Sequence, residues 1–264
     1  MLKTRVITAI FFGLTVIFSI MYASTELALG VLLLAFAICA FEYIQLAKFE
    51  KFHSAILTIL LTLSAFFVVS NPGHFYFITV LGFIWWMGNM FLVSQYPKFI
   101  SVWFHPIYLR YLYAILLFIP SLASIILIYN SYGQFSLLSL FLILWTADSG
   151  AYFVGSKMGK RKLAPKVSPG KSMEGLFGGI VSVVVLSLIL LMANLLPFQS
   201  FLFVVISAMT GIISVFGDLF ESIIKREASA KDSSNLLPGH GGFLDRLDSL
   251  FAAAPIYYLG LTLL

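Results

Sequence analysis

The chain has 264 residues, of which 61% are hydrophobic and 10% are charged. A soluble globular domain carries about 25% charged residues, so this composition excludes that class and predicts an integral membrane protein. The single cysteine, Cys39, excludes an intramolecular disulfide and a thiolate metal site, and its apolar neighbours predict a small core side chain. The formal net charge is +5, and its distribution along the chain is more informative than its size.

Apolar runs follow one another along the whole chain. A membrane-spanning helix needs about 20 predominantly apolar residues. Runs of roughly this kind occupy residues 6–22, 27–46, 55–70, 75–93, 109–129, 135–154, 176–195, 201–224 and 250–264. We therefore predict an all-α, polytopic membrane bundle of about nine transmembrane helices. Short runs and the prolines Pro120 and Pro255 blur individual boundaries.

The first run allows two interpretations. Lys3 and Arg5 precede it and "MYAS" ends it, as in a cleaved signal peptide. The run is longer than the usual apolar region of a signal peptide, about 7–15 residues, which favours a retained first helix. Between two later runs, residues 98–106 carry Trp103 and His105, and we expect this segment to lie at the membrane interface.

The basic residues predict the orientation in the membrane. The connections after the first, third, fifth and seventh runs contain no lysine or arginine. The 16 basic residues lie at the N-terminus, in the other connections or, for Arg110, at the edge of one. The positive-inside rule then places the N-terminus and the basic connections in the cytoplasm and the C-terminus outside. We expect a cell inner (cytoplasmic) membrane protein whose chemistry takes place on the cytoplasmic side.

The polar residues divide the chain into two regions. Residues 1–130 read as N-terminal transmembrane helices, a lipid-facing bundle. Residues 131–264 contain two long cytoplasmic loops, 156–175 and 225–249, and read as the catalytic transmembrane region.

Several acidic residues gather near the predicted cytoplasmic face of that region. Asp148, Asp218 and Glu221 lie near the ends of apolar runs, and Asp245 and Asp248 precede the last run. A carboxylate at membrane depth costs several kcal/mol unless it is paired, protonated or metal-bound. Oxygen ligands without soft neighbours favour Mg²⁺ or a similar hard cation.

A structural alternative applies to single acids. Asp218 and Glu221 share a helix face, and Lys225 follows Glu221 by four residues, so a packing salt bridge would account for either acid. Glu42 has no charged residue near it in the sequence, and we expect it to be structural.

The loop "GSKMGKRKLAPKVSPGKSMEG", residues 155–175, is basic and glycine-containing. A topogenic loop that touches anionic headgroups would also be basic. Ser172, with Glu174 in the next turn, predicts a helix start, and Ser168 and Lys171 before it suit a phosphate. The Walker A spacing is absent. Close helix packing is the expected role of three glycines, Gly175, Gly178 and Gly179.

The stretch "LLPGHGGFLDRLDS", residues 236–249, is polar in an otherwise apolar chain. Gly239, Gly241 and Gly242 flank His240, free the backbone to approach an anionic ligand and offer N–H donors. His240 is a candidate donor to a phosphate. Together with the nearby acids, this stretch predicts a site for a metal-bound polyphosphate at the membrane surface.

These residues resemble a known family. "SIIKREASAKDSSNLLPGHGGFLDRLDS", residues 222–249, is similar to the signature of the phosphatidate cytidylyltransferases (CDP-diacylglycerol synthases), and residues 148–179 resemble a second block of that family. The resemblance implies transfer of CMP from CTP to phosphatidic acid, giving CDP-diacylglycerol and pyrophosphate in phospholipid biosynthesis. It implies Mg²⁺ as cofactor, with a second cation allowed, membrane lipids as surroundings and a homodimer. No nucleic acid partner is expected.

The resemblance also suggests roles for individual residues. The expected catalytic residues are Asp218, Asp245, Asp248, Lys225, Arg246 and His240. The expected substrate-binding residues are Ser168, Lys171, Ser172, Ser222, Arg226, Gly239, Gly241 and Gly242. The expected metal ligands are Asp218, Asp245 and Asp248, with Asp148 and Glu221 as additions.

Three other functions fit the sequence less well. A polyprenyl-phosphate sugar-phosphate transferase would carry an adjacent Asp-Asp pair, which the chain lacks. A CDP-alcohol phosphatidyltransferase would carry its own long aspartate motif, also lacking. An ion-coupled transporter would use intramembrane acids, but such sites usually lie near the midplane and accompany internal repeats.

Overall fold

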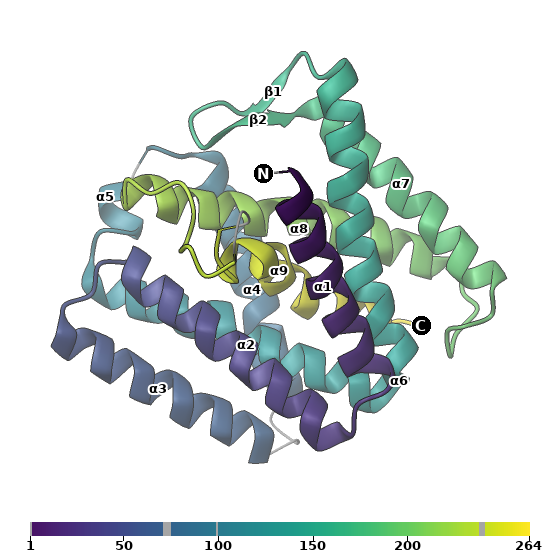
Figure 1. The fold of residues 1–264 in the computed structure, drawn as a ribbon, viewed down its shortest axis with the longest axis horizontal. Coiled ribbons are helices and arrows are strands. Elements are labelled where there is room, and N and C mark those ends of the chain that lie inside the picture. Colours follow the sequence, from purple (N-terminus) through teal and green to yellow (C-terminus); the bar gives the residue numbers. More distant parts are fainter. Residues whose placement is uncertain (1, 71–74, 99, 238–240) are drawn as a thin grey trace.

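The computed structural model describes residues 2–70, 75–98, 100–237 and 241–264. Over these residues the protein is helical apart from one short β-hairpin (Figure 1). In chain order the elements are α1 (Leu2–Met21), α2 (Thr25–Leu46), α3 (Lys51–Ser70), α4 (Phe75–Ser94), α5 (Ile100–Trp103), α6 (Ile107–Met158), β1 (Lys162–Ala164), β2 (Ser168–Ser172), α7 (Met173–Met192), α8 (Leu202–Glu227) and α9 (Leu244–Leu261). The predicted all-α membrane class is confirmed.

Six of the described helices are long and apolar enough to cross a bilayer, namely α2, α3, α4, α6, α7 and α8. A shorter apolar helix, Ile10–Met21, forms part of α1. The number of spans, predicted as about nine, stays a prediction, as do the placement of the termini and the division at residue 130.

Two predicted spans, 109–129 and 135–154, are joined in the 52-residue helix α6. Gly133 lies between them with φ 81° and ψ 177°, so the two helical stretches meet at a kink. This backbone conformation is essentially restricted to glycine. The two runs are separate helical stretches, as predicted, and the non-helical Gly133 divides them.

The prolines of α6 and α9 organise the centre of the bundle. Pro255 has no N–H, so the carbonyl of Phe251 four residues earlier loses its helical donor. Trp86 Nε1 and Ser121 Oγ donate to that carbonyl at 3.1 Å and 2.6 Å. These bonds tie α4 and α6 to α9, in keeping with the rule that freed backbone groups in membrane helices are satisfied by neighbours.

Small residues bring α6 and α7 into close contact. A Cβ on Gly179 would lie 2.7 Å from the carbonyl oxygen of Ala147, and one on Gly178 would lie 2.4 Å from Val154. A Cβ on Gly150 of α6 would lie 2.3 Å from Ser182 Oγ. The predicted close packing through glycines is confirmed, and it fixes the position of the α6 segment that carries Asp148.

The predicted loop 156–175 is shorter and more ordered than expected. α6 continues to Met158, and β1 and β2 pair antiparallel before α7 begins. Ser172 caps α7 by accepting from the backbone N–H of Gly175 at 3.1 Å, as the sequence predicted. The hairpin itself was not predicted. It projects beyond the ends of α6 and α7 (Figure 1).

The segment between α4 and α6 was expected at the membrane interface, with Trp103 at headgroup level. It contains the short helix α5, and Trp103 is buried beside Phe104 and Tyr113. The ring of Trp103 therefore packs inside the protein. His105 is half-exposed and contacts Glu227 Oε2 at 3.0 Å at the end of α8.

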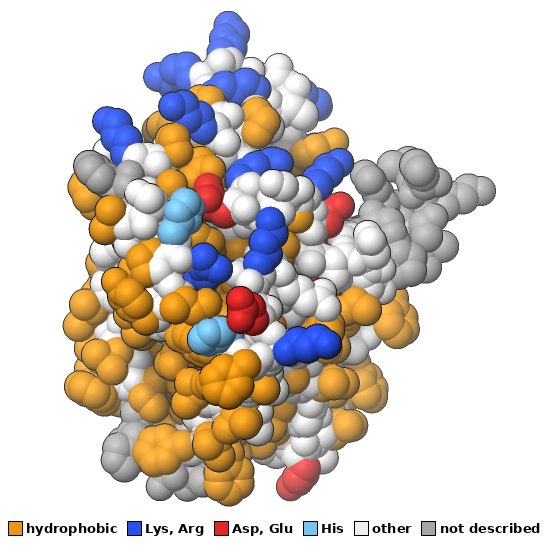
Figure 2. All heavy atoms as spheres, turned by 90° about the vertical axis from the view of Figure 1, so that its left-hand side faces the viewer, with side chains coloured by type: hydrophobic (Ala, Val, Ile, Leu, Met, Phe, Trp, Pro, Cys, Tyr) orange, Lys and Arg blue, Asp and Glu red, His pale blue; other side chains and the backbone are white. Residues whose placement is uncertain are grey.

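Charge is distributed unevenly over the surface. Figure 2 shows lysine and arginine side chains gathered toward one end of the molecule, above a broad hydrophobic surface. Exposed basic residues of the α6 end and the hairpin are Lys157, Lys160, Arg161, Lys162 and Lys166. The apolar surface is the one expected to face lipid.

Candidate active site

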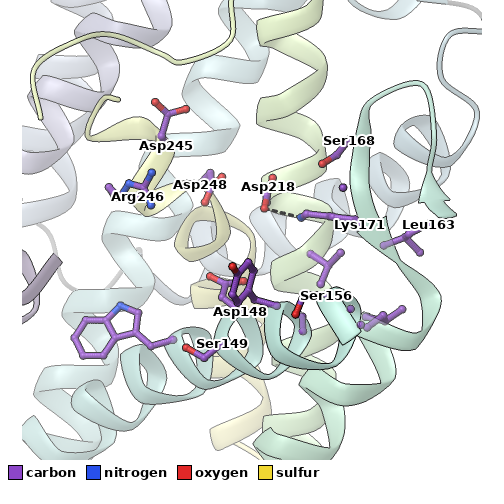
Figure 3. Close-up of a pocket in the computed structure, with 18 of the residues that line it drawn as sticks. Asp148, Ser149, Ser156, Leu163, Ser168, Lys171, Asp218, Asp245, Arg246 and Asp248 are labelled. Atoms are coloured by element: carbon purple, nitrogen blue, oxygen red, sulfur yellow. Dashed lines mark ion pairs between the residues drawn. The ribbon is translucent and has the colours of Figure 1, made fainter. Parts of the chain in front are cut away.

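A cavity of about 840 Å³ opens between α1, α6, the β-hairpin, α7, α8 and the start of α9 (Figure 3). Its lining is of two kinds. The polar part includes Asp148, Ser168, Lys171, Ser172, Asp218, Asp245, Arg246 and Asp248, and the apolar part includes Phe12, Trp145, Tyr152, Leu176 and Val215. A ligand with both charged and apolar parts suits such a cavity.

Three carboxylates from different helices meet at this cavity. Asp148 lies on α6, Asp218 on α8 and Asp248 in the first turns of α9 (Figure 3). Enclosure by the protein raises the pKa of Asp248 well above its ordinary value, and the nearby Asp218 and Asp148 carboxylates raise it further. The arrangement concentrates negative charge and favours a cation at the cavity.

Lys171 partly balances that charge. Its Nζ lies 2.5 Å from Asp218 Oδ2, and the dashed line in Figure 3 marks this ion pair. Strand β2 carries Lys171 to the cavity, and the Ser172 cap fixes the end of that strand to α7. Ser222, one turn along α8, donates to Asp218 Oδ1 at 3.2 Å.

Asp245 is bound on both of its carboxylate oxygens. Lys225 Nζ lies 2.6 Å from Oδ1, while Oδ2 accepts from the backbone N–H groups of Ser233 and Gly242, both at 2.8 Å. Burial alone would raise the pKa of Asp245, but these N–H donors and the Lys225 ammonium hold it below its ordinary value. Asp245 thus joins α8 to the start of α9.

Lys225 also forms an ion pair with Glu221, one turn earlier on α8. This is the packing salt bridge that the sequence offered as an alternative role for Glu221. Glu221 is buried and is not among the residues that line the cavity. Arg226 donates to the carbonyl of Val167 at 3.1 Å and holds the hairpin turn against α8. Like Ser222, Lys225 and Arg226 stand behind the cavity wall rather than in it.

The glycines of the signature fall into two groups. Gly241 has φ +83°, and a Cβ there would lie 2.5 Å from Asp245 Oδ2. Gly242 donates to the same oxygen. In this structure the absence of a side chain at Gly241 lets the backbone pass close to the Asp245 carboxylate, and Gly242 donates a hydrogen bond to it. Gly239 and His240 lie outside the described residues.

One buried acid has a larger part than the sequence suggested. Glu42 of α2 accepts hydrogen bonds from Ser233, Ser234 and the backbone N–H groups of Phe243 and Leu244. Its partners lie 191 to 202 residues away in the chain. The residues near Glu42 in the sequence do not predict these contacts. The available signal is that Glu42 is a single acidic residue in an apolar run.

The carboxylates fit a hard cation in their chemistry but not as a preformed cage. Among the described residues, no three histidine, cysteine or acidic side chains converge closely enough to hold a metal. Magnesium usually keeps several waters and takes one or two protein carboxylates together with substrate phosphates. Asp148, Asp218 and Asp248 are suitable donors for that kind of site.

The fold and this cavity describe a polytopic membrane protein that handles a ligand with charged and apolar parts. A family model described as the cytidylyltransferase family matches residues 3–264. The chain belongs to this family.

Relatives carry a more specific name. The chain is 44% identical over 195 residues to the phosphatidate cytidylyltransferase of Haemophilus influenzae, covering 70% of this chain and 68% of the relative. It is 33% identical over 273 residues to the phosphatidate cytidylyltransferase of Pseudomonas aeruginosa, covering 97% of this chain and 96% of the relative. The phosphatidate cytidylyltransferase of Bacillus subtilis is 43% identical over 134 residues, about half of each chain. The family predicted from the signature is confirmed.

Proposed function

We propose that this chain transfers CMP from CTP to phosphatidic acid and releases pyrophosphate. The observation that carries the proposal is a cavity lined by carboxylates, Lys171, Arg246 and apolar side chains of α1, α6, α7 and α8. One substrate is a polyanion and the other a lipid, so the reaction requires such a mixed lining. The family membership and the names of the relatives agree with it.

The proposed reaction does not require a strong general base from the protein. A phosphate oxygen of phosphatidic acid bonds to the α-phosphorus of CTP, and the bond from that phosphorus to the bridging α–β oxygen breaks. Pyrophosphate leaves with the electron pair. Because the lipid phosphate is already ionised near neutral pH, positioning and charge stabilisation supply most of the catalysis.

The described residues fall into two groups: those that contact substrate, and those that hold the substrate-contacting residues in place. Lys171 and Arg246 line the cavity and are the cations best placed to contact phosphates, with Ser168 as a hydroxyl donor. Lys225 and Arg226 do not line the cavity. Lys225 fixes Asp245, and Arg226 fixes the hairpin turn. The positions proposed for Gly239 and His240 lie outside the described residues.

Magnesium is part of the proposal. Asp148, Asp218 and Asp248 would hold it, and it would supply charge neutralisation on the phosphates. Asp245 stays a predicted ligand, but its oxygens already accept from Lys225, Ser233 and Gly242. Among the described residues, Oδ2 carries the contacts to Ser233 and Gly242, and Oδ1 contacts Lys225. Glu221 stays a predicted addition; it is paired with Lys225 and is not among the residues that line the cavity.

Three further features extend the proposal. The active site faces the cytoplasm, as the distribution of lysine and arginine favours. The membrane is the cell inner membrane, in line with the bacterial relatives. The chain forms a homodimer, on family resemblance, which light scattering of the detergent-solubilised protein would test.

The direct test uses purified protein in detergent with Mg²⁺, labelled CTP and phosphatidic acid. We expect CDP-diacylglycerol and pyrophosphate only when both substrates and the cation are present. A chelator removes the product, and dATP in place of CTP gives none. Folded protein that makes no product under these conditions would contradict the proposal and favour an ion-coupled transporter.

A further inference from the structure

We infer that Glu42 is a positioning residue for cytidylyl transfer, acting through the segment that leads into α9. This inference rests on the proposed function and assigns a role to the N-terminal half of the chain. We call residues 232–237 and 241–244 the capping segment. It leads directly into Asp245, Arg246 and Asp248, all of which line the cavity.

Among the described residues, the hydrogen bonds of Glu42 go to the capping segment. Its Oε1 accepts from Ser234 Oγ at 2.5 Å and from the N–H of Phe243 at 3.1 Å. Its Oε2 accepts from Ser233 Oγ at 2.9 Å and from the N–H of Leu244 at 2.7 Å. Each oxygen therefore binds one hydroxyl and one backbone N–H.

The electrostatics make these contacts hard to replace. Glu42 is 0% exposed, and a buried carboxylate is tolerated only when hydrogen bonds or opposite charge compensate its lost hydration. The N–H groups of Phe243 and Leu244 belong to the first turn of α9, where the helix dipole also favours an anion. Glu42 thus acts as the N-terminal cap that α9 lacks from its own sequence, since Phe243 offers no side-chain acceptor.

A short path links Glu42 to the cavity. Ser233 Oγ lies 2.9 Å from Glu42 Oε2 and also 2.9 Å from Asp245 Oδ2. Gly242 is enclosed between the same groups, because a Cβ there would lie 2.5 Å from Glu42 Oε1 and 2.0 Å from Ser233 Oγ. A change at Glu42 would therefore reach Asp245 through one hydroxyl and one glycine.

Glu42 itself does not touch the cavity, since no described residue of α2 lines it. Its effect on the reaction must pass through the residues it holds. A small displacement of catalytic groups is known to lower turnover strongly even when the fold is intact. This separates a positioning role from a role in stability alone.

The test compares three variants. Glu42→Gln keeps the shape but removes the charge and one strong acceptor. Ser234→Ala removes one donor to Glu42 and leaves Asp245 with its partners. Glu26→Gln, an exposed acid in the first turn of the same helix, is the matched control. For each protein we would measure kcat and KM with CTP and phosphatidic acid, the thermal midpoint, and trypsin cleavage after the exposed Lys231.

We expect Glu42→Gln to lower kcat by about 10- to 100-fold with a smaller change in KM, and to speed cleavage after Lys231. Ser234→Ala should lower kcat less. In the double variant Ser234→Ala should add no further loss, because its hydroxyl acts through Glu42. Glu26→Gln should match the wild type.

Three results would overturn the inference. They are a wild-type kcat in Glu42→Gln, independent and additive losses in the double variant, and a loss of activity that only follows the loss of folded protein. If Glu42→Gln fails to fold, a normal kcat in Ser234→Ala overturns it, and a lowered kcat at an unchanged thermal midpoint supports it. Wild-type protein that makes no product would refute the proposed function, while the cleavage measurement would still decide the Glu42 contact.

Discussion

Single charged residues at the cavity act in two distinct ways. Lys171 lies in the wall, where its ammonium group faces the cavity and forms an ion pair with Asp218. Asp245 also lies in the wall, but both of its oxygens accept from the protein. The sequence placed Lys171 in the basic loop and Asp245 in the signature, and it expected both to contact substrate or metal. The contacts distinguish them, because Asp245 has several protein partners and Lys171 has one ion pair among the described residues.

Replacing Lys171 with methionine should lower kcat/KM for CTP by about a hundredfold, because a cation that stabilises charge on the transferring group is lost. Lys166→Met is the matched control, since Lys166 is exposed on the same hairpin and does not line the cavity. Steady-state kinetics of both variants checks this. Equal losses in the two variants would mean that the hairpin acts only through its overall charge.

Asp245→Asn should destabilise the protein at neutral pH by about 2 kcal/mol, because the charged contacts to Lys225 and the backbone donors weaken. The pKa of Asp245 is lowered in the folded protein, so its carboxylate stabilises the fold above the ordinary carboxyl pKa, near 4. That contribution is lost as the pH falls through the lower folded pKa. The thermal midpoints of wild type and variant should therefore differ at pH 7 and converge below about pH 4. A constant difference across this range would contradict the assignment.

At the scale of elements, α6 shows how one residue orients a long helix. Its first half packs in the centre through Ser121 and Phe118, and its second half carries Asp148 to the cavity. Gly133 sets the angle between the halves. The direction of the second half therefore depends on a backbone conformation available only to glycine.

Gly133→Ala should cost about 1–3 kcal/mol, since φ 81° is strained for any L side chain while no atom lies near the added Cβ. Gly30→Ala in α2 is the control, because Gly30 also has open space but ordinary helical angles. That change should be neutral or slightly stabilising. Thermal unfolding of both variants in detergent separates backbone strain from added volume. Equal midpoints would exclude a role for the kink.

At the scale of the whole molecule, the cavity joins parts of the chain that are far apart. Its walls come from α1, α6, the hairpin, α7, α8 and α9, and Glu42 of α2 holds one wall in place. Several exposed basic residues, including Lys162 and Lys166, lie on the hairpin beside the cavity. This agrees with the cytoplasmic orientation that we propose.

Single-cysteine labelling tests that orientation. Cys39 is buried, so a new cysteine would be the accessible one among the described residues. We expect Lys166→Cys to react with a membrane-impermeant maleimide only after cells are permeabilised, and Gln199→Cys, in the connection between α7 and α8, to react in intact cells. The opposite pattern would reverse the topology.

The sequence alone determined the membrane class, the family and the charged residues of the cavity. Hydrophobicity and helix starts are local properties, so the apolar runs and the Ser172 cap could be read from neighbouring residues. The signature likewise marked Asp245, Arg246 and Asp248, which the structure brings to one cavity with Asp148, Lys171 and Asp218.

Tertiary structure alone decided how those residues are used. It buried Trp103, turned α6 at Gly133, paired Lys225 with both Glu221 and Asp245, and placed Ser222 and Arg226 behind the cavity wall. Glu42 is the clearest case, because its compensating donors lie 191 to 202 residues away. The physical reason is that a buried charge is stabilised by whatever surrounds it in space, and those neighbours are set by helix packing and not by local sequence.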